Sequence, residues 1–231
     1  MGATYVDEFT ESFSLNPTTT ALLVIDMQNA TGNPAHGLGK LLESQGRLES
    51  ASYRFERIKN TIVPNTQRLL KHFRDMGAPV IYVTYGAELP DCSDVPKHIR
   101  KLVLATNNKA GEIEHEIVDE LKPLPSEPVL NKVTMGAFGS TGIDTLLKAK
   151  GIKEIVCTGV STNNCVGMTA MEASDRGYSV VLASDATGTC SDEMQDAFIA
   201  MFLRLWGKVM SCDEVIAEIG DGKNEDLASA G

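Results

Sequence analysis

The chain has 231 residues, with 31 acidic and 21 basic side chains that give a formal charge of −10. Its composition, 42% hydrophobic and 23% charged, is typical of a globular protein and excludes wholesale disorder. An acidic chain without a basic stripe is a poor candidate for binding nucleic acid or an anionic membrane. Its apolar runs are strand-sized, far below the roughly 20 residues that span a bilayer. We therefore expect neither nucleic acid nor a membrane as a partner.

The cysteines and the N-terminus bear on the cellular compartment. Residues 1–8 have neither the basic nor the apolar segment of a secretory signal. The five cysteines are odd in number and form no Cys-x-x-Cys pair: Cys92, Cys157, Cys165, Cys190 and Cys212. This usage predicts reduced thiols and a cytoplasmic protein, and it leaves one thiol available as a nucleophile.

The first third of the chain predicts a strand, a loop, a helix and a second strand. Residues 20–25 are continuously apolar and stop at Asp26, as a buried strand does. Residues 29–46 are polar and glycine-rich, which is typical of a loop. Apolar side chains recur at helical spacing over 58–76, and the β-rich run 79–84 follows.

Residues 86–128 form the least regular part of the sequence. They hold most of the prolines, and only 112–121 has the pattern of a short helix. A connection of this length is usually functional, and we expect a lid or an arm at a subunit interface.

Strands and helices alternate regularly in the rest of the chain. We expect strands at 129–132, 154–159, 178–183 and 208–210, and helices at 142–150, 163–176, 191–206 and 213–219. This alternation predicts an α/β fold with three layers, α-β-α, built on a mostly parallel sheet. We expect one domain over 1–231, with its core at about 19–220 and 86–128 as the arm.

Three residues at the carboxyl ends of these strands are chemically complementary. In parallel sheets, ligands bind at this edge, and here it carries Asp26, Lys132 and Cys165. A helix start and a nearby cation lower the pKa of a thiol, and a carboxylate can accept its proton. Backbone N–H groups at the helix start can hold an oxyanion. Spacing alone also allows Cys165 to be a small buried residue.

Three segments carry a resemblance to a known family. The sequence reads Val-Ile-Asp-Met-Gln-Asn at 24–29, Lys-Val-Thr-Met-Gly-Ala-Phe-Gly at 132–139 and Gly-Val-Ser-Thr-Asn-Asn-Cys-Val-Gly-Met-Thr at 159–169. In this order and with this spacing they resemble the first-strand, lysine and nucleophile motifs of the isochorismatase-like cysteine hydrolases. The resemblance covers roughly residues 19–212.

The resemblance implies a six-stranded sheet and a triad. Asp26 is the general base and acid, Lys132 the cation that steadies thiolate and carboxylate, and Cys165 the nucleophile. It also implies a cis peptide between Val160 and Ser161, with the N–H groups of Ser161 and Cys165 forming an oxyanion hole. The candidate substrate contacts are Gln28, Asn29, Tyr85, Phe138, Val160 and Asn164. The alternative for Gln28 and Asn29 is a bond to the local backbone, and the alternative for Phe138 is a packing role.

The activity implied is that of a metal-free cysteine amidohydrolase without a cofactor. It would cleave a C–N bond of a small carboxamide or ureide, biuret-like, triuret-like or N-carbamoyl, through a thioester and release ammonia or an amine. Members that bind metal carry an Asp-x-His after the second strand, and residues 82–91 contain none. Cys165 argues against vinyl-ether hydrolysis, which needs no thiol. The family also implies a homodimer or homotetramer.

Several alternatives stay open. The chain can be a catalytically silent scaffold or binding protein, although such a scaffold has no need of all three triad residues. It can also be a thiol redox sensor that pairs Cys165 with Cys190. The usual Asp-Phe after the first motif is replaced by Ala-Thr at 30–31, so an aromatic wall is missing there. No motif supports any arginine, Arg54 included, as the group that binds a substrate carboxylate. This favours a neutral ureide over an N-carbamoyl amino acid as the substrate.

Overall fold

The structure is a computed structural model that describes residues 7–10 and 12–228. The expectation about a leader segment concerns residues that lie mostly outside this part. The centre of the molecule is a six-stranded sheet in the order β3-β2-β1-β4-β5-β6, and every neighbouring pair is parallel. The strands are β1 Thr20–Ile25, β2 Val80–Tyr85, β3 Val129–Lys132, β4 Glu154–Val160, β5 Ser179–Gly188 and β6 Lys208–Met210. The expected α/β fold is confirmed.

The strand order has a topological switch point between β1 and β4. From β1 the chain runs outward through β2 to β3, then returns to the other side of β1 and runs outward again through β4, β5 and β6. The connections that leave β1 and β4 therefore diverge to opposite sides. Open α/β sheets bind ligands in the crevice outside the carboxyl ends of such a strand pair.

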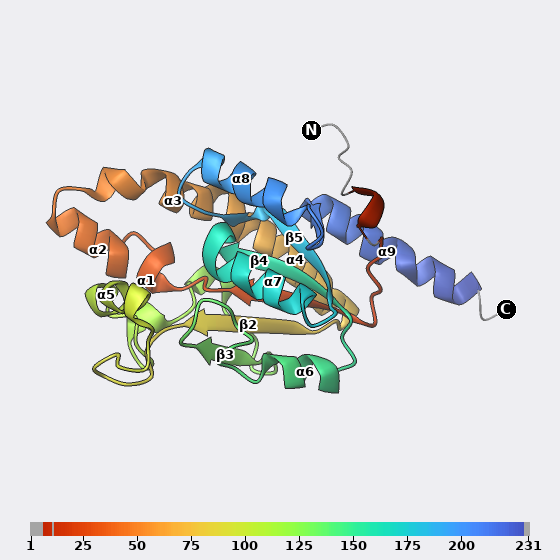
Figure 1. Ribbon diagram of the computed structural model, residues 1–231, viewed down its shortest axis with the longest axis horizontal. Coiled ribbons are helices and arrows are strands. Elements are labelled where there is room, and N and C mark those ends of the chain that lie inside the picture. Colours follow the sequence, from red (N-terminus) through yellow and green to blue (C-terminus); the bar gives the residue numbers. More distant parts are fainter. Residues whose placement is uncertain (1–6, 11, 229–231) are drawn as a thin grey trace.

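Helices cover both faces of the sheet. The α-helices are α1 Asn29–Gly32, α2 Gly37–Ser44, α3 Ser52–Arg57, α4 Val63–Met76, α5 Lys97–Thr106, α6 Ile143–Ala149, α7 Gly167–Ser174, α8 Asp192–Phe202 and α9 Cys212–Ala228. Side chains alternate along β1, so Leu22 points to the face covered by α4 and α9 and Leu23 to the face covered by α6, α7 and α8. Figure 1 shows α7 in front of the sheet and α4 behind it.

The helix ends follow ordinary capping chemistry. Helix α4 buries Thr66, Leu69 and Phe73 along one stripe and ends at Gly77, whose φ of 71° is left-handed. Helix α8 begins at the expected cap, where the Ser191 side chain accepts a hydrogen bond from the Met194 N–H.

The segment before α4 is more helical than expected. Residues 29–46 were expected to be a loop, but they contain α1 and α2. The helical run that ends at Met76 begins at Ser52 rather than at residue 58, and it passes through a π-helical stretch, η3 Ile58–Ile62. Gly39 permits the tight entry into α2, because a Cβ there would lie 1.9 Å from the Pro34 carbonyl oxygen.

The prediction of a helix at 112–121 is wrong. That segment holds two short 3-10 turns, η4 Ile113–His115 and η5 Asp119–Leu121, and the true helix of the arm is α5. The physical reason is that the backbone of residues 116–118 pairs with the segment that follows β1, which interrupts the helical hydrogen-bond pattern. The Asn29 N–H donates to the Glu116 carbonyl, and the Val118 N–H donates to the Met27 carbonyl. The arm is therefore tied to the site's edge of the sheet.

Helices α1, α2 and α5 gather at the end of the sheet to which the arrows of β2 and β3 point (Figure 1). This end holds the carboxyl ends of the strands, so the arm and the first two helices cover the switch point. None of the helices in the described part has the length and apolarity to cross a bilayer.

Candidate active site

A buried ion pair lies at the carboxyl edge of the sheet. Asp26 follows β1 with a left-handed φ of 53°, which turns its side chain away from the strand direction. Lys132 ends β3, is fully buried, and donates from Nζ to Asp26 Oδ2 over 2.9 Å. The strand between them contributes Tyr85, which pairs in register with Lys132 and places its ring 4.3 Å from Nζ. Three adjacent strands thus hold the pair.

The pair combines a lysine whose pKa is raised with a carboxyl group that keeps one free acceptor oxygen. Burial alone would lower the pKa of Lys132, but the charge of the paired Asp26 and the hydrogen bond to it act in the opposite direction, and the pKa is raised. Asp26 Oδ1 is buried and has no hydrogen-bond partner among the described residues. A carboxylate oxygen in this condition is ready to accept a proton.

Cys165 reaches this pair because the end of β4 packs closely against the end of β1. Gly159 has a φ of 108°, and a Cβ there would lie 2.0 Å from the Ile25 carbonyl oxygen. The Val160–Ser161 peptide is cis. The chain then enters the π-helical stretch η6 Thr162–Val166, which carries the half-buried Cys165, and continues as α7.

The electrostatics of Cys165 differ from the sequence-based expectation. The pKa of the thiol is raised to about 12, first by burial and then by the charge of Asp26, while the charge of Lys132 opposes both. The expected lowering by a cation and a helix start is therefore wrong for the resting site, because Asp26 neutralises the cation. Cys165 rests as a thiol and needs a base at the moment of attack.

A cavity of about 180 Å³ opens onto these groups. It is small compared with the roughly 300–1,000 Å³ of pockets for drug-sized ligands, so it suits a small substrate. Helices α2 and α5 supply most of the apolar lining residues. The lining includes Asp26, Cys165, Arg54, Tyr85, Ser161 and Asn164, with Leu38, Ile99, Leu102 and Val103 on the apolar side.

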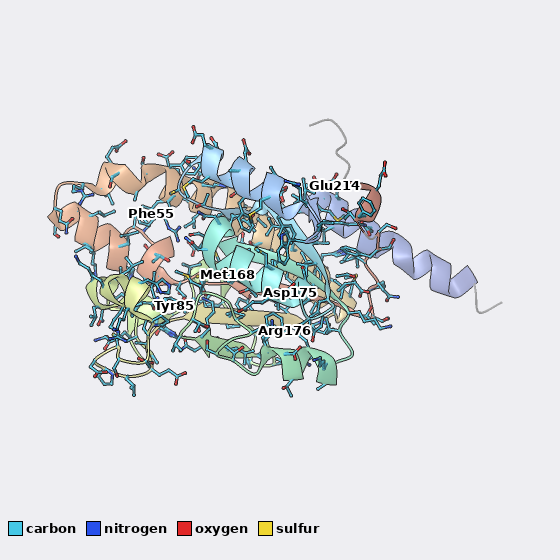
Figure 2. All side chains as sticks on the ribbon, in the orientation of Figure 1. Phe55, Tyr85, Met168, Asp175, Arg176 and Glu214 are labelled. Atoms are coloured by element: carbon cyan, nitrogen blue, oxygen red, sulfur yellow. The ribbon has the colours of Figure 1, made fainter. Side chains whose placement is uncertain are left out.

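Four of the six expected substrate contacts line this cavity: Gln28, Tyr85, Val160 and Asn164. Figure 2 shows Tyr85 where the carboxyl end of β2 meets the arm. Its hydroxyl is buried without a hydrogen-bond partner among the described residues, and burial raises its pKa. The Gln28 amide serves the backbone, accepting from the Tyr85 N–H and donating to the His115 carbonyl.

The other two expected contacts are not among the lining residues. The Asn29 amide donates to the Ile113 carbonyl and accepts from the Asn33 amide, so it ties α1 to the arm. The ring of Phe138 lies 6.0 Å from that of Tyr178, within the core on the α7 face. Both residues serve the packing that surrounds the site.

Arg54 is a charged lining residue that no sequence motif placed at the site. It lies on α3, far from every motif, and donates to the Thr31 carbonyl and to Ser161 Oγ. Nothing in the local sequence distinguishes it from Arg57 on the same helix, because only the tertiary packing of α3 over the switch point brings it to the cavity.

Two other features of the described residues concern possible metal ligands and the cysteines. Within the described residues, no three His, Cys, Asp or Glu side chains gather as metal ligands. All five cysteines are free, and the exposed Cys190 contacts Met194 while Cys165 contacts Met135. The two thiols thus have different sulfur neighbours.

Comparisons with known proteins agree with the fold. A family model described as the isochorismatase domain matches residues 20–214. A ureidoacrylate amidohydrolase from Pseudomonas savastanoi pv. phaseolicola is 29% identical, over 88% of this chain and 85% of that protein. The N-carbamoylsarcosine amidase structure from Thermoplasma acidophilum is 27% identical, with a TM-score of 0.63 over 85% of this chain and 98% of its own. A cysteine hydrolase structure from Pseudomonas syringae pv. phaseolicola, 23% identical, shares the fold with a TM-score of 0.75 over 91% of this chain and 97% of its own.

Proposed function

The chain belongs to the isochorismatase family, and we propose that it is a cysteine amidohydrolase that cleaves a small carboxamide or ureide through a thioester. Its named relatives are amidohydrolases and an amidase, so it is a hydrolase of non-peptide C–N bonds. The observation that carries the finer proposal is the buried Asp26–Lys132 pair, with an unpartnered carboxylate oxygen, on the same small cavity as the Cys165 thiol.

Acylation begins with attack of Cys165 Sγ on the substrate carbonyl. As the C–S bond forms, the thiol proton passes to Asp26, because the raised thiol pKa leaves almost no thiolate at neutral pH. The backbone N–H groups of Ser161 and Cys165 receive the negative oxygen of the tetrahedral intermediate. Collapse of the intermediate breaks the C–N bond, and Asp26 returns the proton to the departing nitrogen.

In deacylation, water is the nucleophile and the Cys165 sulfur is the leaving group. Water attacks the thioester carbonyl and gives a proton to Asp26, and the C–S bond breaks as Asp26 protonates the leaving sulfur. Lys132 transfers no proton in this scheme. Its fixed charge stays paired with Asp26 and stabilises negative charge on sulfur during each step.

Ammonia release from a panel of small amides tests the proposal. The panel holds biuret, triuret, N-carbamoylsarcosine, ureidoacrylate, maleamate and nicotinamide, each with wild-type protein and Cys165→Ser. We expect turnover of at least one compound, lost in the variant and unchanged by a chelator. Turnover that survives in Cys165→Ser would overturn the cysteine mechanism, and turnover that the chelator removes would overturn its metal independence. No turnover of any compound would favour the silent scaffold.

A further inference from the structure

Arg54 brings a positive charge into the cavity. Its Nε donates to the Thr31 carbonyl over 2.9 Å, and its Nη1 donates to Ser161 Oγ over 2.8 Å. These two bonds fix the plane of the guanidinium. Nη2 has no hydrogen-bond partner among the residues that the structure describes, although the side chain lines the cavity.

This charge has no counter-ion in the described part of the chain. No carboxylate there lies within 4.0 Å of Arg54, whereas Asp26 is already neutralised by Lys132. The polar end of the cavity is therefore positive by about one charge. Burial lowers the pKa of the guanidinium, which shows how far it is withdrawn from water. A cation in this setting gains most from an anionic partner.

We propose that Arg54 binds a carboxylate of the substrate, so that the amide or ureide is also an acid. This inference rests on the proposed function, because Cys165 fixes where the reacting carbonyl lies. Arg54 holds the Ser161 side chain, and the Ser161 N–H is a proposed oxyanion donor. The carboxylate therefore lies only a few bonds from the reacting carbonyl, as in an N-carbamoyl amino acid, a ureido acid or the half-amide of a diacid.

The apolar wall agrees with this substrate class. Leu38, Ile99 and Val103 line the same cavity, so a short hydrocarbon part of the substrate finds contacts there. The geometry revises the preference for a neutral ureide, which depended on the lack of an arginine motif.

A purely structural role for Arg54 is the competing explanation. Its bonds also tie α3 to the loop after α1 and to the end of β4, and losing them would slow every reaction of Cys165 alike. A carboxylate site, in contrast, favours anionic reagents over neutral ones. The two explanations therefore differ in a ratio of rates.

Alkylation of Cys165 measures this ratio without knowledge of the substrate. Iodoacetate carries a carboxylate beside its reactive carbon, and iodoacetamide is the neutral analogue. We would measure both second-order rates at Cys165 by peptide mass spectrometry at pH 9, in wild type, Arg54→Gln and Arg57→Gln. Arg57 is the matched control, because it lies on the same helix and binds the Thr187 and Ser184 carbonyls outside the cavity.

We expect the iodoacetate-to-iodoacetamide ratio to fall about 10- to 100-fold in Arg54→Gln, the loss of one charge-assisted bond, and to stay unchanged in Arg57→Gln. Equal ratios in wild type and Arg54→Gln would overturn the carboxylate site. If Cys165 resists both reagents, titration calorimetry provides the test. It compares the affinities of N-carbamoylglycine and its methyl ester for Cys165→Ser, with and without Arg54→Gln. Resistance of Cys165 to both reagents would count against its role as nucleophile. Weak binding of N-carbamoylglycine that is unchanged by Arg54→Gln would count against this inference.

Discussion

Replacing Asp26 by asparagine should separate catalysis from thiol reactivity. The pKa of Cys165 is raised from 9.0 to about 12, first by burial and then by the charge of Asp26, while Lys132 lowers it. Three pH units correspond to about a thousandfold less thiolate at neutral pH than an ordinary thiol holds. The Asp26→Asn variant removes the charge that raises the pKa and leaves the Lys132 ammonium facing the sulfur alone.

The magnitude follows from Coulomb's law. A unit charge about 4 Å away contributes about 4 kcal/mol at an effective dielectric constant of 20, or about three pH units at most. Because burial is the larger cause and is unchanged, we expect the pKa to fall by at least about one unit. Alkylation of Cys165 by iodoacetamide at pH 7.5 should then accelerate about tenfold or more. Turnover should fall by about 10²- to 10⁴-fold, because the general base is gone.

The assay pairs ammonia release with the pH profile of alkylation. In wild type the alkylation rate should climb about tenfold per pH unit up to at least pH 10, and in Asp26→Asn it should level off at lower pH. Asp144→Asn is the matched control, because Asp144 pairs with Lys148 away from the cavity. Full turnover in Asp26→Asn, or slower alkylation together with lost turnover, would refute the assignment of Asp26.

Three further substitutions test the packing of the site. Lys132→Met leaves Asp26 buried without its partner, so the free energy of unfolding in urea should drop by about 3–5 kcal/mol, and the double variant with Asp26→Asn should recover most of it. A single variant as stable as wild type would contradict this. Gly159→Ala should lose more stability than Gly77→Ala, because a Cβ at 159 meets a β1 carbonyl oxygen at 2.0 Å. Gly77→Ala has only the cost of a left-handed backbone, about 1–2 kcal/mol. Equal losses of stability would show that β1 and β4 can separate. Tyr85→Phe should leave thermal stability unchanged, since its hydroxyl has no partner in the described chain, and lower kcat/KM about two- to tenfold. A large fall in the melting temperature would instead make that hydroxyl structural.

The fold was largely predictable because its strands are buried on both faces. Residues 20–25 and 80–85 are continuous apolar runs that end at polar residues, and such runs define parallel strands without help from the rest of the chain. The arm was not predictable in this way. Residues 116–118 pair through their backbone with the segment that follows β1, and no local sequence pattern predicts this long-range pairing.

The candidate site also has a part that the sequence predicts and a part that it does not. Asp26, Lys132 and Cys165 each follow a strand, so topology alone brings them to one edge of the sheet. Arg54 comes from α3, and only its tertiary contacts with Thr31 and Ser161 bring it to that edge. The direction of the Cys165 pKa likewise depends on burial and on Asp26 together, which spacing in the sequence does not measure.

Acid quenching during turnover tests the central claim most directly. The protein would be mixed with the compound from the panel that releases ammonia fastest, quenched within the first turnovers and mapped by peptide mass spectrometry. We predict an acyl group on Cys165 whose mass is that of the substrate less the departing amine, and no such group in Cys165→Ala. Sustained turnover by Cys165→Ala, with no covalent adduct on the wild-type peptide, would contradict the account.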